Sequence, residues 1–262
     1  MLAAFIPLTE QNVTGYMGVL LPVLYKVLAA DEMFVIREVT GAAGLLGRYV
    51  DPDLYLGLLL SHVGLNPDAS GAFTIGVLRV LGALVSGTPV QKLTPSHRAR
   101  VAAALADRDV LVVEDVTRMR EVAEVVKVLA GKMTEVAGEV GVGEEEGIAL
   151  FGVLTTLVSV PGSDKVPGWS EMISKAEWAF LDFAKAHNFD SVDKLIPTYF
   201  DQFLTNFTMN VKNWTRFSIG ELRTLDVFLQ KAGPFVGERL EPLIELFAHG
   251  VTEEKDFEVR QW

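Results

Sequence analysis

The sequence contains no cysteine, and this absence removes several kinds of chemistry at once. Without cysteine there is no disulfide, no thiol nucleophile and no thiolate ligand for a metal. Histidine is also scarce, and its four residues are His62, His97, His187 and His249. They lie far apart, and none forms the His-x-x-x-His pair of a zinc-binding helix. We therefore expect no metal site.

Long apolar runs are missing as well, although half of the residues are hydrophobic. The longest uncharged stretch, 147–163, has 17 residues, which is fewer than the roughly 20 that a membrane-spanning helix needs. The N-terminus has no basic residue before its apolar stretch, unlike a signal peptide. These features predict a soluble, cytoplasmic protein with no membrane partner.

Basic charge is in deficit, because 34 acidic residues face 23 basic ones and the net charge is −11. Repulsion from phosphates argues against a nucleic-acid partner. The glycines at 141, 143 and 147 are spaced one residue too widely for a dinucleotide-binding loop, and the three glutamates between them would repel a pyrophosphate. We therefore expect no cofactor and no enzymatic activity.

Helical periodicity is present almost throughout, and no segment shows a convincing strand alternation. Proline, glycine and acidic residues at the ends of the apolar stripes divide the chain into about eleven helices. We expect them near residues 10–30, 33–48, 52–64, 69–86, 95–107, 114–138, 144–160, 169–187, 191–210, 215–232 and 235–250. The fold class is therefore all-α.

Three of these helices share a proline near the start of an apolar stripe. Pro197 and Pro242 are 45 residues apart, and Pro22 precedes Pro197 by 175 residues, close to four times that step. A period of about 40–47 residues with two helices per unit is typical of HEAT repeats. A proline inside a helix removes a hydrogen bond and clashes with the preceding turn. We expect the prolines to mark where first helices begin or kink, and the first helix to be in two pieces.

Segment 31–47 resembles a HEAT unit. Asp31 falls in a turn, Ile36-Arg37 opens the next helix, and Ala42-Ala43 and Leu45-Leu46-Gly47 close it. In the HEAT superfamily the turn aspartate and the helix arginine pair between neighbouring units. The resemblance implies a right-handed α-α superhelix in which Asp31 and Arg37 are structural, and in which the small residues let the second helix pack closely.

A narrower resemblance covers residues 16–130. It is carried by Gly-Arg-Tyr-Val-Asp-Pro at 47–52, the leucine-rich helix 54–63, Ser-Gly at 70–71 and Gly-Thr-Pro at 87–89. These residues are similar to part of the HEAT-repeat dynein axonemal assembly factor family. The resemblance implies a cytoplasmic solenoid without a catalytic motif that helps to pre-assemble dynein arms for cilia and flagella. Dynein chains and chaperones would be its partners.

We expect one solenoid over residues 1–250 and a charged tail over 251–262. Residues 16–28 are apolar almost all round, with Lys26 as the one charge. A helix that is apolar on every face is normally buried on every face. The sequence is therefore expected to be a piece of a longer array, or this helix is expected to dimerise.

Partner contacts are expected on the second helix of each pair, near 33–48, 69–86, 114–138, 169–187 and 215–232, which by resemblance line the concave side. Helix 114–138 places Glu114 with Arg118, Arg120 with Glu124, and Glu124 with Lys127 at helical spacings. No individual partner-binding residue can be assigned from sequence. Two other functions stay open: an adaptor in transport or phosphatase complexes, and a ligand carrier that uses the Trp- and Phe-rich region after residue 168.

Overall fold

The computed structural model describes residues 6, 10–29, 32–63, 71–107, 109–212, 219–238, 241, 243, 244 and 248. Every regular element within them is helical. The α-helices are α2 (Met17–Leu28), α3 (Met33–Tyr49), α4 (Pro52–Val63), α5 (Ala72–Gly87), α6 (Pro95–Leu105), α7 (Val116–Glu135), α8 (Glu144–Ser159), α9 (Trp169–Ala186), α10 (Leu195–Lys212) and α11 (Ile219–Ala232). The 3-10 helices are η1 (Glu10–Tyr16), η2 (Val90–Lys92), η3 (Val192–Lys194) and η4 (Gly233–Glu238).

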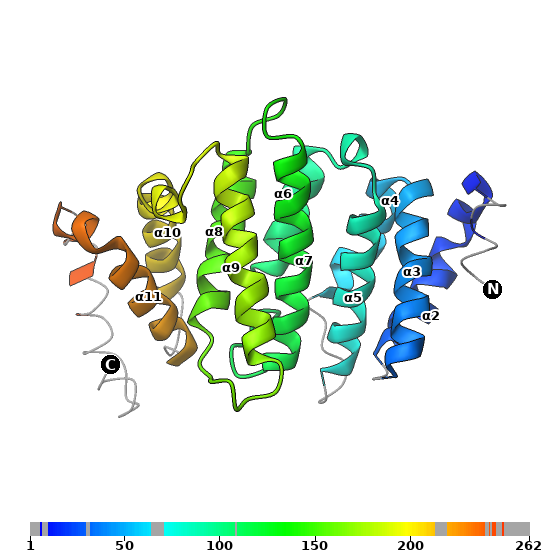
Figure 1. Ribbon diagram of the computed structural model, residues 1–262, viewed down its shortest axis with the longest axis horizontal. Coiled ribbons are helices and arrows are strands. Elements are labelled where there is room, and N and C mark those ends of the chain that lie inside the picture. The colour runs from blue at the N-terminus through cyan, green and yellow to red at the C-terminus, as the bar shows by residue number, and fades with distance from the viewer. Residues whose placement is uncertain are drawn as a thin grey trace.

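The predicted all-α HEAT-like solenoid is confirmed. The helices stand side by side in chain order, from α2 at one end of the row to α11 at the other (Figure 1). In one layer α3 packs against α5, α5 against α7, and α7 against α9. In the other layer α4 packs against α6, α6 against α8, and α8 against α10. We call α3, α5, α7 and α9 the second-helix layer, since each is the second helix of its pair.

Local sequence explains where the helices begin. Thr94 caps α6, because its hydroxyl accepts a hydrogen bond from the backbone N–H of His97 at 3.3 Å, and Pro95 occupies the first turn, where its missing N–H costs nothing. Asp115 caps α7 in the same way by accepting from the backbone N–H of Arg118 at 3.0 Å. These side chains satisfy amide groups that a helix leaves unpaired at its start.

The first predicted helix is indeed in two pieces, but the break is not at the proline. The 3-10 helix η1 ends at Tyr16, whereas Pro22 lies in the middle of α2. Pro197 lies near the start of α10, as expected. The helix predicted near 235–250 overlaps η4, and most of its remaining length lies outside the described residues. Pro242 lies there too.

A single apolar cluster runs through the described part of the array. It fills the space between the two layers, as the periodicity of the helices requires. None of the described helices combines the length and the apolar character needed to cross a membrane. The layers therefore hold together by burial along one long core, and their outer faces are free to carry polar and charged groups.

Candidate partner-binding surface

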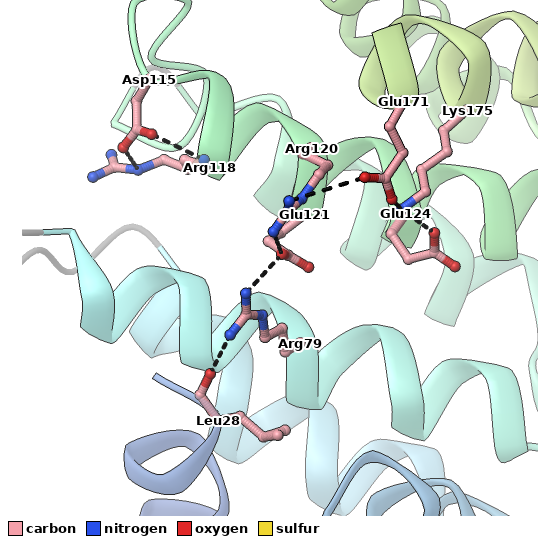
Figure 2. A network of polar contacts seen from close by, with 9 residues as sticks. All are labelled: Leu28, Arg79, Asp115, Arg118, Arg120, Glu121, Glu124, Glu171 and Lys175. Atoms are coloured by element: carbon pink, nitrogen blue, oxygen red, sulfur yellow. Dashed lines mark hydrogen bonds and ion pairs between the residues drawn. The ribbon is translucent and has the colours of Figure 1, made fainter. Parts of the chain in front are cut away.

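A row of charged side chains crosses the second-helix layer from α5 through α7 to α9 (Figure 2). We call it the charged row, and its members are Arg79, Arg120, Glu121, Glu124, Glu171 and Lys175. Each of its three helices contributes side chains that reach the neighbouring helix. The row therefore joins successive repeats by polar contacts, in addition to the apolar core.

Arg79 on α5 begins the row. Its Nη1 donates to the carbonyl oxygen of Leu28 at the end of α2 at 2.7 Å, and its Nη2 lies 3.1 Å from Oε1 of Glu121 on α7. Both side chains of this pair are largely buried, at 8% and 12% exposed. Glu121 also pairs with Arg120 at 3.0 Å. A charge-assisted contact with so little exposure is stronger than an open surface pair.

Lys175 on α9 completes the row. Its Nζ lies 2.8 Å from Oε2 of Glu124 on α7 and 2.8 Å from Oε1 of Glu171, one turn earlier on its own helix. Arg120 reaches Glu171 at 3.9 Å. The i, i+4 spacing of Glu171 and Lys175 puts both on the side of α9 that faces α7.

These contacts change the acidity of two members of the row. The hydrogen bond from Lys175 holds the pKa of Glu171 below its usual value. Partial burial opposes the charge of Lys175, but its hydrogen bonds to Glu124 and Glu171 outweigh that effect and raise its pKa. Both groups are therefore charged near neutral pH, and the row presents fixed, alternating charges rather than groups poised for proton transfer.

Apolar side chains stand exposed on the same layer. Phe34 on α3 is 77% exposed, and on α9 Trp178 and Leu181 are 57% and 40% exposed. Tryptophan is enriched among the residues that dominate protein–protein binding energies. Fixed charges together with exposed aromatic and aliphatic groups can recognise another protein.

Only one residue of the predicted Asp31–Arg37 pair lies in the part of the chain that the structure describes. Arg37 lies on α3 with an exposed side chain. Asp31 lies outside the described residues, so its pairing with Arg37 stays a prediction. A related contact occurs in a later repeat, where Arg118 on α7 is buried, pairs with Asp115 at 3.4 Å and donates to the carbonyl oxygen of Asp109 at 3.0 Å. The sequence signal that could have revealed this contact is the spacing Asp-x-x-Arg at the start of a helix.

The pairs predicted within helix 114–138 are largely replaced by contacts to other residues. Arg118 pairs with Asp115 instead of Glu114, and Glu124 pairs with Lys175 on the next helix instead of Lys127. A helical wheel identifies which residues share a face, but a long side chain at the edge of that face can also reach the next helix.

Sequence analysis also missed a buried ion pair between α6 and α8. Nε of Arg98 lies 2.5 Å from Oε1 of Glu146, and their side chains are only 2% and 1% exposed. Glu146 further accepts from the backbone N–H of Gly143 at 3.3 Å. The run of three glutamates in the first turn of α8 indicated a helix start, but not that the third one is buried.

The region rich in Trp and Phe gives no ligand-sized cavity where the structure describes it. Phe151 packs against the rings of Phe180, Tyr199, Phe203 and Phe228, with centroid distances of 5.2–6.2 Å. The pocket beside Phe151 holds about 30 Å³, whereas small-molecule sites usually hold about 300–1,000 Å³. These rings therefore serve as core.

In the part of the chain that the structure describes, paired helices stacked side by side in two layers form a solenoid of the HEAT-repeat class. Residues 1–161 match the family model described as "Dynein axonemal assembly factor 5, HEAT-repeat domain". The match covers more than half of the chain, and the chain belongs to this family. The resemblance noted from the sequence is confirmed.

Curated relatives extend the similarity beyond the family match. The chain is 27% identical over 232 residues to dynein axonemal assembly factor 5 of Homo sapiens, which covers 88% of this chain and 25% of that protein. The protein of the same name from Mus musculus is 25% identical over 236 residues, covering 90% of this chain and 25% of the relative. The chain thus spans about a quarter of the length of these relatives. No solved structure matches it.

Proposed function

We propose that this chain is a non-catalytic, cytoplasmic protein-binding scaffold that assists the assembly of axonemal dynein arms. The observation that carries the proposal is the family match over residues 1–161, in which the matching model is named for dynein assembly. The relatives in Homo sapiens and Mus musculus carry the same name.

The second-helix layer supports a binding role. A solenoid places successive helices side by side, so that one face runs the length of the array and can contact an extended partner. The charged row ties its own cations to its own carboxylates, which leaves partner recognition to the exposed groups around it, such as Trp178 and Phe34. A rigid row with exposed aromatics is suited to holding a folding intermediate of a large protein.

The partners that we propose are dynein chains and chaperones. The net charge of −11 favours basic or extended protein segments. We propose no nucleic-acid partner, because the negative net charge repels a phosphate backbone. We also propose no cofactor and no membrane contact.

The test is deletion of the gene in a flagellated cell, followed by electron microscopy of axoneme cross-sections. We expect inner or outer dynein arms to be missing, and re-expression of the full gene to restore them. Normal arms in the deletion strain would overturn the proposal.

Affinity purification from the same cells separates the dynein role from an adaptor role. Recovery of dynein heavy chains with chaperones supports the assembly function. Recovery of phosphatase or transport-complex subunits in their place would support the adaptor alternative.

A further inference from the structure

The second-helix layer is interrupted after α9. The layer predicts that α11 should stand beside α9, as α9 stands beside α7. Instead α11 packs against α8 and α10, and the hydroxyls of Ser159 on α8 and Thr224 on α11 lie 2.9 Å apart. Helix α11 therefore does not extend the row of packed second helices, and Phe228 on α11 packs instead against Phe151 on α8 and Phe200 on α10.

A shallow groove lies at this interruption. Its floor comes from α8, one wall from α9, and the other wall from α11 and the start of α10. The lining residues are Phe151, Thr155, Val158, Phe180, Val192, Asp193, Ile196, Phe228 and Lys231. Six of these nine side chains are apolar, and the space between them has a volume of about 30 Å³.

The two charged residues of the groove stand exposed at its rim, Asp193 in η3 and Lys231 at the end of α11. Within the described part of the chain neither has an ion-pair partner, whereas the neighbouring Lys194 pairs with Asp190 at 2.7 Å and Lys185 pairs with Asp182 at 2.9 Å. The carboxylate of Asp193 accepts a hydrogen bond from the hydroxyl of Ser191 at 3.4 Å. Among the described residues, the carboxylate and the ammonium group thus flank an apolar floor without counter-charges.

We propose that this groove binds an amphipathic segment of a protein partner. The segment inserts the tip of one aliphatic side chain over Val158, between Phe180 and Phe228, and places a basic residue against Asp193 and an acidic residue against Lys231. The inference rests on the proposed scaffold function, since it names the chemistry of a partner segment that the scaffold would bind.

The size and the charges of the groove decide between kinds of segment. A volume of about 30 Å³ accepts the end of a Leu or Ile side chain but not an aromatic ring. Leu181, which follows Phe180 on α9 and is 40% exposed, adds apolar area on the solvent side. A segment with two acidic flanks would place a like charge against Asp193, and a segment with two basic flanks would place a like charge against Lys231. A segment with one acidic and one basic flank avoids both repulsions and binds best.

The test uses three pools of short synthetic peptides on an array, probed with the full chain at physiological salt. Each peptide has a central Leu with a charged residue about one helical turn away on each side, and the remaining positions are varied among Ala, Ser and Gln. The pools carry Lys and Glu, two Lys, or two Glu as flanks. Matched peptides with Asp in place of the central Leu report binding that does not use the apolar floor.

Wild-type chain should retain the mixed pool about threefold more strongly than either other pool, because solvent screens the exposed charges at the rim. Lys231→Glu should shift the preference to the two-Lys pool, and Asp193→Lys should shift it to the two-Glu pool. Lys127→Glu and Glu135→Lys, exposed residues of α7, are the matched controls and should leave the ranking unchanged.

Val158→Phe should fill the groove and abolish retention of every Leu pool, with urea unfolding to check that the chain remains folded. Should that variant unfold, the exposed Lys231→Glu and Asp193→Lys variants still decide the question.

Equal retention of the Leu and Asp peptides, an unchanged ranking in both charge variants, or no retention at all would overturn the inference. If the peptide test fails but deletion of the gene still removes dynein arms, the groove does not bind such a segment and the proposed function is retained. If the peptide ranking depends on the groove but the deletion strain has normal dynein arms, only the role in dynein assembly is overturned.

Discussion

The two halves of the array pack their helices by opposite means. Between α3 and α5 the backbones nearly touch: a Cβ added to Gly47 would collide with the carbonyl group of Leu84, and one added to Gly87 would collide with that of Gly44. Around α8, rings fill the space between helices, with Phe151 at the centre of the ring cluster. The same solenoid thus contains two interhelical spacings. The close spacing needs glycine, and the wide spacing needs aromatic rings.

This difference predicts that equivalent mutations have opposite consequences in the two halves. At the contact between α3 and α5 a methyl group added to Gly47 or Gly87 has no room, whereas in the C-terminal half a removed ring leaves a cavity. It also explains the shift of α11. Closely packed helices keep a regular row, while a cluster of rings on α8 and α10 provides a broad seat on which α11 packs away from α9.

The largest effect is expected for Phe151→Ala in the ring cluster. The substitution should lower the free energy of unfolding by about 3–5 kcal/mol, because it removes a buried ring that contacts four others and leaves a cavity. Urea denaturation monitored by circular dichroism measures the loss. Phe34→Ala, on the 77% exposed ring of α3, is the control and should change stability by less than about 0.5 kcal/mol. Similar losses in both variants would contradict the cavity argument.

The second-largest loss of stability is expected when a methyl group is added at the contact between α3 and α5. Gly47→Ala should destabilise the chain by about 1–3 kcal/mol, since backbone of α5 rather than a flexible side chain occupies the space and α3 must move. Gly41→Ala in the same helix has no atom within 4 Å of the new methyl group and should stabilise the helix by about 0.5–1 kcal/mol. Thermal unfolding of both variants compares them directly. If both substitutions change the stability in the same direction, α3 and α5 are not in close contact at Gly47.

A buried tyrosine allows a test by pH near the same glycine contact. The hydroxyl of Tyr55 lies 2.9 Å from Oγ1 of Thr88, which donates to the carbonyl oxygen of Gly47 or Leu84. Burial raises the pKa of Tyr55 to about 12. Because the folded-state pKa exceeds the unfolded value near 10, this stabilisation is complete below pH 10 and is lost as pH rises through 12.

Urea unfolding at about pH 9 and about pH 11 should therefore show a drop in stability that is smaller in Tyr55→Phe. Tyr16→Phe, on a largely exposed ring, should retain the full drop. If the two variants behave alike over this range, Tyr55 does not ionise with the proposed penalty.

The helices of both halves could be predicted from sequence, but many of their partners could not. Apolar periodicity and capping residues placed α3 through α9 within a few residues of their observed ends. The burial of Arg98 was missed because its partner Glu146 lies 48 residues away. Nothing local distinguishes Arg98 from Arg100, which pairs with Asp53 on the surface. Periodicity identifies the face of a helix that is buried, whereas the neighbour that meets that face is set by the packing of the array.

The smallest effect is expected at the charged row, where α7 joins the two halves (Figure 2). Glu171→Gln should cost less than about 1 kcal/mol near pH 7, since Glu171 is 54% exposed and solvent screens its pairs with Lys175 and Arg120. The pKa of Glu171 is lowered in the folded chain. Its contribution is therefore present above the unfolded pKa of about 4.5 and is lost as pH falls through the folded value. The difference in unfolding free energy between wild type and Glu171→Gln should shrink at about pH 3. A difference that persists there would show that the carboxylate charge does not hold α9 to α7, and that the join depends on the apolar core alone.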